Sequence, residues 1–142
     1  MKIVALIPAR GGSKGIKNKN IKKLNGYPLI YYSIMLAKKS KYINDVIVTT
    51  DSEEIANIAK EYGANVPFLR PKEISADLSP DIDFFKHYLN WAKENNSTPD
   101  VIIQLRPTYP LRKLDTLNSC IEKFIQNYDD YDSLRSVVKN NY

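Results

Sequence analysis

A basic, glycine-rich loop follows the first apolar stretch of the chain. Residues 9–20 hold three glycines, one arginine and three lysines, and no acidic residue offsets their charge. Glycine lets the backbone approach a ligand and point its N–H groups at phosphate oxygens, while arginine binds two oxygens at once and lysine acts as a point charge. The loop therefore predicts a polyphosphate site. The groups expected to bind the phosphates are Arg10, the backbone of Gly11 and Gly12, Ser13, Lys14 and Lys19.

The spacing of these glycines excludes two better-known phosphate-binding loops. The P-loop pattern G-x-x-x-x-G-K-[ST] fails because Ile16 stands where the second glycine is required. The dinucleotide fingerprint G-x-G-x-x-G also fails, because the glycines stand at 11, 12 and 15. A tight, solvated turn without a ligand is the alternative interpretation.

The positive charge of the chain is concentrated in this one region. The formal net charge is +5, and six of the 21 basic residues lie between positions 10 and 23. The remainder holds 15 basic against 16 acidic residues, a balance of −1. A compact anionic ligand therefore fits better than nucleic acid, which an extended basic stripe would bind.

Composition narrows the class of protein further. No stretch approaches the roughly 18 consecutive apolar residues of a membrane helix, and the N-terminus begins a strand instead of a signal peptide, so we expect a cytoplasmic protein with no membrane partner. One cysteine and one histidine leave no intramolecular disulfide and no His/Cys zinc site.

Strand-like and helix-like segments alternate along the 142 residues. Their alternation predicts a single α/β domain with a mostly parallel sheet and helices on both faces, in three layers. The expected strands are 2–8, 45–50, 66–69, 101–105 and 133–138, and the expected helices are 28–37, 52–62, 80–92 and 114–126.

Four charged residues each follow directly on a predicted strand: Arg10, Asp51, Arg70 and Arg106. Parallel sheets bind ligands beyond the carboxyl ends of their strands, so we expect these four side chains to converge on one edge. The aromatic residues of the predicted helix 80–92 follow a helical period and belong to the core, and we interpret His87 on that helix as structural or exposed.

Four ordered stretches of the chain resemble the acylneuraminate cytidylyltransferases, the CMP-sialic acid synthetase family. They are residues 7–20 with 25–30, residues 48–52 with 55–56, residues 69–77, and residues 105–112. The resemblance covers nearly the whole chain. It implies a Rossmann-like nucleotidyltransferase fold and a reaction of CTP with an acidic sugar, which gives a CMP-sugar and pyrophosphate.

The resemblance also implies roles for individual residues. It places the nucleotide at Arg10, Asn20, Arg70, Ser79 and Asp81, and the sugar near Arg106 and Thr108. Arg10 and Lys19 are the candidate catalytic residues, because the charge that develops on the leaving pyrophosphate needs cations. The family usually has serine at the place of Asp81 and glutamine at the place of Arg106. These departures leave a related nonulosonic acid or another surface sugar as open as sialic acid.

The same resemblance implies a metal cofactor and an oligomeric state. Nucleotidyl transfer normally uses Mg²⁺, and the family supplies its Asp-x-Asp ligands after the point that corresponds to residue 142. Residues 1–142 would then be the nucleotide-binding portion of one domain, truncated relative to the family, without assigned metal ligands and without the segment that makes the full-length form a homodimer. Two other functions stay open: a sugar nucleotidyltransferase that uses a different nucleotide, and an inactive nucleotide-binding fragment or assembly partner.

Overall fold

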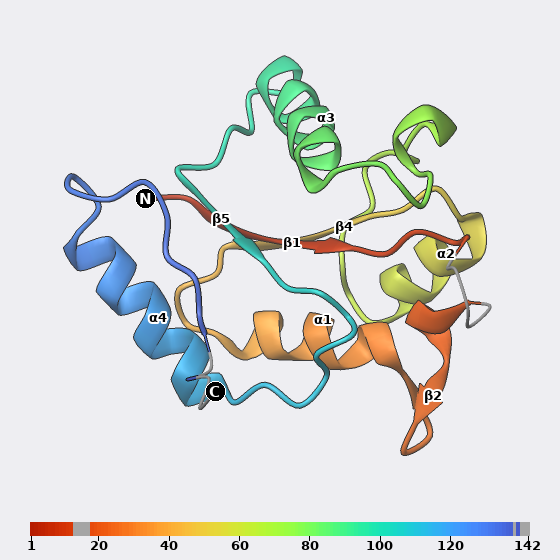
Figure 1. The fold of residues 1–142 in the computed structure, drawn as a ribbon, viewed down its shortest axis with the longest axis horizontal. Coiled ribbons are helices and arrows are strands. Elements are labelled where there is room, and N and C mark those ends of the chain that lie inside the picture. Colours follow the sequence, from red (N-terminus) through yellow and green to blue (C-terminus); the bar gives the residue numbers. More distant parts are fainter. Residues whose placement is uncertain (13–17, 138, 140–142) are drawn as a thin grey trace.

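The computed structural model describes residues 1–12, 18–137 and 139. Its centre is a parallel three-stranded sheet in the order β4-β1-β5 (Figure 1). β1 (Ile3–Pro8) lies between β4 (Asp45–Thr49) and β5 (Val101–Gln104), and Ala5 is in register with Val46 on one side and Ile103 on the other. The strands therefore end at the same edge of the sheet.

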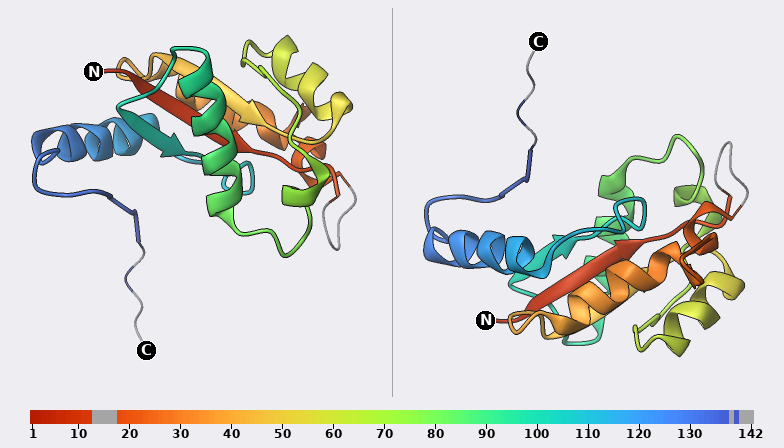
Figure 2. Two further views of the ribbon diagram at one scale, coloured as in Figure 1. Left: turned by 90° about the horizontal axis from the view of Figure 1, so that it is seen from above. Right: turned by 90° about the horizontal axis from the view of Figure 1, so that it is seen from below.

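Helices cover both faces of this sheet. α3 (Asp81–Glu94) packs on one face, and α1 (Leu29–Lys39), α2 (Glu53–Glu61) and α4 (Leu114–Gln126) belong to the opposite side (Figure 2). The expected α/β architecture is confirmed. None of the described helices has both the length and the apolar character needed to cross a membrane.

Alternation along β1 explains how one strand supports two cores. Side chains of Ile3, Ala5 and Ile7 enter the cluster with α1, α2 and α4, whereas Val4 and Leu6 enter the cluster with α3. All five are buried, which accounts for the unbroken apolar run in the sequence. The aromatic residues of α3 divide as the helical period predicts: Phe84 and Tyr88 are buried, and Phe85 and Trp91 are partly buried.

Two expected strands are wrong. Residues 66–69 form no strand, and a single bridge from Ile47 to Asn65 stands in their place, because Pro67 has no N–H to continue the ladder. Residues 133–137 are exposed and lie outside any strand, while Val138 falls outside the described residues. This segment has no neighbouring strand to pair with among the described residues, and unpaired strands are unstable.

A short hairpin after the basic loop was not predicted. β2 (Lys23–Leu24) pairs antiparallel with β3 (Tyr27–Pro28), and the turn residues Asn25 and Gly26 both have positive φ, at 52° and 86°. Asn-Gly is the preferred sequence for such a turn, so the signal was present. Two short 3₁₀ helices, η1 (Lys19–Ile21) and η2 (Lys72–Ile74), complete the described elements.

Candidate nucleotide-binding site

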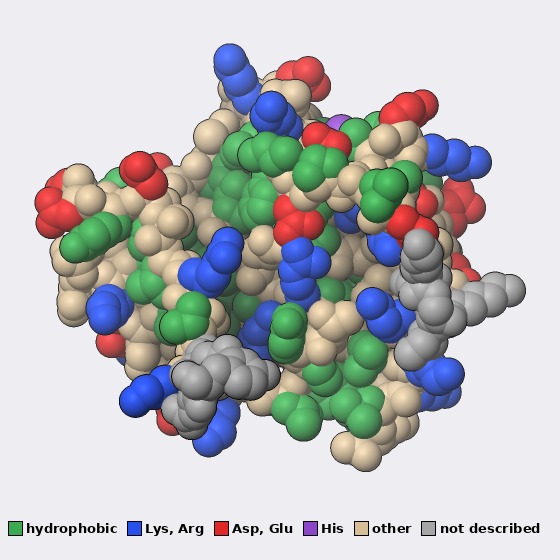
Figure 3. Space-filling view, viewed as in Figure 1, with side chains coloured by type: hydrophobic (Ala, Val, Ile, Leu, Met, Phe, Trp, Pro, Cys, Tyr) green, Lys and Arg blue, Asp and Glu red, His purple; other side chains and the backbone are tan. Residues whose placement is uncertain are grey.

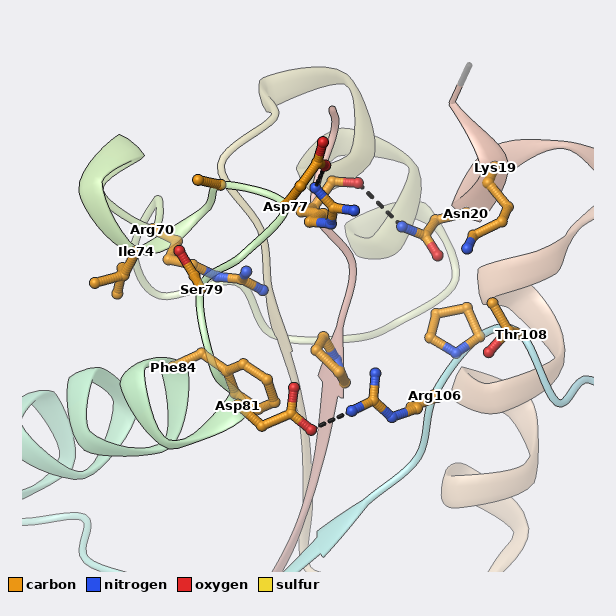
Figure 4. A pocket seen from close by; sticks show the side chains of 14 residues that line it. Lys19, Asn20, Arg70, Ile74, Asp77, Ser79, Asp81, Phe84, Arg106 and Thr108 are labelled. Atoms are coloured by element: carbon orange, nitrogen blue, oxygen red, sulfur yellow. Dashed lines mark hydrogen bonds and ion pairs between the residues drawn. The ribbon is translucent and has the colours of Figure 1, made fainter. Parts of the chain in front are cut away.

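A pocket of about 220 Å³ lies beyond the carboxyl ends of β1 and β5 (Figure 4). It brings together eight of the predicted site residues, and their individual roles stay predictions. Gly11 and Gly12 are described but stand outside the pocket lining, and Ser13 and Lys14 lie outside the described residues. The eight residues are Arg10, Lys19, Asn20, Arg70, Ser79, Asp81, Arg106 and Thr108.

Hydrogen bonds hold the two described ends of the loop after β1, at residues 10–11 and at Asn20. The Asn20 side-chain amide donates to the Arg10 carbonyl oxygen at 3.0 Å, and the Gly11 N–H donates to Asp51 Oδ1 at 2.8 Å. A Cβ at Gly11 would lie 3.0 Å from the Ser52 Cβ, so this glycine allows the loop to approach the start of α2. Asp51 lies at the end of β4, as expected, and positions the backbone of Gly11. Unlike Arg10, Arg70 and Arg106, it does not line the pocket.

Arg70 is the buried cation of the pocket. Its backbone N–H donates to the Thr50 carbonyl oxygen at 2.7 Å, which places it beside the end of β4 without a strand of its own. Its Nε donates to Thr49 Oγ1 at 3.1 Å and its Nη2 donates to the Thr49 carbonyl oxygen at 2.7 Å. The guanidinium also lies 5.3 Å from the centre of the Phe84 ring. Burial lowers the pKa of Arg70, and nearby Asp51 opposes that shift.

Two carboxylates of the pocket are paired with its other arginines. Arg10 Nη1 forms an ion pair with Asp77 and also donates to the Gly12 carbonyl oxygen at 2.9 Å. Arg106 Nη2 forms an ion pair with Asp81, whose Oδ2 also accepts from the Gln104 amide at 3.2 Å. The two residues at which the chain departs from the family pattern, Asp81 and Arg106, thus contact each other.

Sequence reasoning missed Asp77 as a site residue, although it ended one of the four resemblance stretches. Ser79 precedes Pro80 and is by sequence a natural helix cap, but α3 begins at Asp81 and no side-chain cap bond is present there. Ser79 instead lines the pocket. The Ile74, Ala76 and Phe84 side chains add an apolar wall that no polar motif could indicate.

The described residues contain no cluster of side chains that would hold a metal ion by itself. No group of three or more His, Cys, Asp or Glu residues within ranges 1–12 and 18–137 could hold a metal ion. Of the carboxylates that line the pocket, Asp77 and Asp81 are each paired with an arginine, and Asp83, in the first turn of α3, is not part of the lining.

His87, on α3, packs against the Phe68 ring. Its ring meets Phe68 edge-on with the centroids 4.5 Å apart, and its Nδ1 is buried without a hydrogen-bond partner in the described structure. Burial lowers its pKa below the usual 6.5, and the charge of Arg70 lowers it further. The expectation that His87 is structural agrees with this position, since it does not line the pocket.

The lowered pKa of His87 predicts a pH-dependent stability. Below about pH 6.5 the unfolded chain binds this proton more readily than the folded chain, so the free energy of unfolding falls as the pH decreases. A His87→Phe variant is expected to lose less stability than the parent between pH 7 and pH 5 in urea titrations. Equal losses in the two proteins would show that other groups cause the acid sensitivity.

Two known proteins match most of this chain in sequence. The pseudaminic acid cytidylyltransferase of Campylobacter jejuni is 40% identical over 131 residues, which are 92% of this chain and 56% of that protein. The N-acylneuraminate cytidylyltransferase of Escherichia coli O18:K1:H7 is 39% identical over 140 residues, which are 99% of this chain and 32% of that protein. The chain thus spans about half the length of the first of these relatives, and less of the second.

A solved structure shares the fold. The CMP:2-keto-3-deoxy-manno-octonic acid synthetase complexed with CTP superposes with a TM-score of 0.76 at 19% identity, over 90% of this chain and 49% of that one. This likeness confirms the Rossmann-like nucleotidyltransferase fold. The sequence model of the family described as cytidylyltransferase matches residues 4–141. This match covers almost every residue of the sheet, the helices and the pocket, and the chain belongs to the cytidylyltransferase family.

Proposed function

We propose that this chain is the nucleotide-binding part of an enzyme that joins CTP to an acidic sugar of the nonulosonic acid class. The observation that carries the proposal is the gathering of four cations, Arg10, Lys19, Arg70 and Arg106, around one pocket at the strand ends. A pocket of this charge suits a triphosphate together with a carboxylate. Relatives named for pseudaminic acid and N-acylneuraminate, and a structural neighbour complexed with CTP, support the choice of substrates.

The reaction is a substitution at the α-phosphorus of CTP. A hydroxyl oxygen of the sugar forms a new bond to this phosphorus, its proton passes to solvent, and the bond to the β-phosphate oxygen breaks to release pyrophosphate. Arg10 and Lys19 are proposed to stabilise the negative charge that accumulates on the pyrophosphate. Asn20, whose amide already donates to the Arg10 carbonyl, keeps its oxygen available for a ribose or base donor.

Arg106 is proposed to hold the carboxylate of the sugar. Its guanidinium faces the pocket from the loop after β5, and Thr108 follows it along the same wall (Figure 4). A guanidinium binds a carboxylate through two parallel hydrogen bonds, which the glutamine usual at this place cannot do. This difference favours a sugar acid whose carboxylate is the main contact, within the nonulosonic class.

Three further properties belong to the same proposal. The use of Mg²⁺ during turnover and a homodimeric full-length form rest on the family resemblance, and a cytoplasmic location rests on the sequence composition. No step above is assigned to a metal, because no metal ligands are assigned among the described residues.

Calorimetric titration tests the nucleotide first. CTP is expected to bind more tightly than UTP, ATP and GTP, both with and without Mg²⁺. Preference for another triphosphate would favour a different sugar nucleotidyltransferase. Mass spectrometry after incubation with CTP, Mg²⁺ and a nonulosonic acid then tests turnover, and binding of CTP without any CMP-sugar would indicate a nucleotide-binding portion that needs the rest of a longer enzyme.

A further inference from the structure

Both carboxylates of the pocket come from one short segment, residues 77–81. Asp77 pairs with Arg10 after β1, and Asp81 pairs with Arg106 after β5, so the segment joins the ends of two strands across the pocket. The space-filling view shows acidic and basic side chains next to one another on this face, below α3 (Figure 3). Two of the pocket's four cations are thus matched by anions of the protein itself.

The segment has little apolar anchorage. Leu78, between the two carboxylates, is 94% exposed, and the Ser79 N–H donates to the carbonyl oxygen of Ala76, just before the segment, at 3.1 Å. By contrast, Arg70 is bound to Thr49 and covered by Phe84. The ion pairs of Asp77 and Asp81 link this segment to the loops after β1 and β5.

We propose that Asp77 and Asp81 are internal counter-ions that occupy the places of ligand anions at Arg10 and Arg106, so that binding of the ligand is an exchange of carboxylate for ligand anion. The inference rests on the proposed function in that the ligand is a triphosphate with an acidic sugar. Each arginine keeps its position in the empty pocket, and the pocket as a whole avoids an uncompensated cluster of cations. Affinity for the ligand is then set by competition with the two aspartates.

This competition predicts the direction in which ligand affinity changes when an aspartate is removed. Removing a carboxylate removes both the pair that must be broken and a like charge beside the bound ligand, so affinity should rise. The side chains are between 28% and 46% exposed, so each pair is worth what a solvent-exposed ion pair is worth, and a gain of about threefold in affinity is expected for each. A purely orienting role for the aspartates would give the opposite change.

The test compares isosteric variants with charge-matched controls. Asp77→Asn and Asp81→Asn are titrated with CTP and, separately, with inorganic tripolyphosphate, beside the parent. Glu73→Gln in η2 and Asp83→Asn in α3 remove the same charge from nearby positions outside the pocket lining. The proposal expects tighter binding of either probe in the first two variants, and a clearly smaller gain in the controls.

The outcomes separate this inference from the proposed function. Tighter tripolyphosphate binding in the two variants, without CTP preference in the parent, would support the counter-ions and reject the function. Specific CTP binding in the parent, with equal or weaker binding in both variants, would support the function and overturn the counter-ions. Gains as large in the controls would assign the effect to overall charge and overturn the proposal. If both variants fail to melt cooperatively, the aspartates serve the fold and the proposal is likewise overturned.

Discussion

Lys19→Ala is expected to bind CTP at least about tenfold more weakly than the parent chain. Lys19 begins η1 and lines the pocket opposite Arg70, and no ion pair holds its ammonium group within the described part of the chain (Figure 4). A hydrogen bond to a charged group contributes about 1.5–3 kcal/mol, which corresponds to roughly tenfold to 150-fold in affinity. Calorimetric titration at two salt concentrations measures both the loss and its electrostatic share.

Lys22→Ala is the matched control for this loss. Lys22 belongs to the same basic region, carries the same charge and is exposed outside the pocket lining. Its removal lowers the general attraction of the surface for anions, which salt screens, and should weaken CTP binding no more than about twofold. Equal losses in the two variants would mean that the region attracts CTP only through its total charge, and that Lys19 makes no specific contact.

Much of the fold was predictable because its signals are local. The β-branched run at 45–49 and the acidic first turn of α2 after Ser52 are such signals, and Ser52 Oγ indeed accepts from the Ile55 N–H at 3.2 Å. The strand expected at 66–69 failed because Pro67 interrupts a ladder whose partner lies elsewhere in the chain. A strand depends on its neighbour as well as on its own sequence, so short apolar runs are the weakest predictions.

The part of the site that lies at strand ends was predictable from the sequence. Arg10 and Arg106 share the pocket because β1 and β5 are parallel and end at one edge, whereas Arg70 reaches it through its backbone bond to Thr50 and not at the end of a strand. The partners of these arginines were not predictable. Asp77 reaches Arg10 through the path of the loop between η2 and α3, and no periodicity in the sequence determines such a path. The burial of Arg70 depends in the same way on where Phe84 lies in the packed structure.

Arg70→Lys is expected to lower the free energy of unfolding by about 1–3 kcal/mol, and to weaken CTP binding at least as much as Lys19→Ala does. Lysine keeps a charge at a position that is only 5% exposed, but it cannot donate to Thr49 Oγ1 and the Thr49 carbonyl oxygen with the planar geometry of arginine. The Thr49 carbonyl oxygen keeps the Ala9 N–H as a donor at 3.0 Å, but the loss of hydrogen bonds from a charged group still costs stability in this range. Urea denaturation monitored by circular dichroism measures the change.

Arg135→Lys, at an exposed position, provides the control, since surface substitutions usually change stability by less than about 0.5 kcal/mol.

Measuring both stability and CTP binding separates the structural role of Arg70 from its role in binding. Its burial lowers its pKa, so the fold carries a desolvation cost for this charge, and the Thr49 bonds and the Phe84 ring offset only part of it. If Arg70→Lys were as stable as the parent yet bound no CTP, Arg70 would serve the ligand alone. If stability fell while CTP binding stayed intact, Arg70 would be a structural arginine, and the nucleotide site would have to rest on Arg10, Lys19 and Asn20.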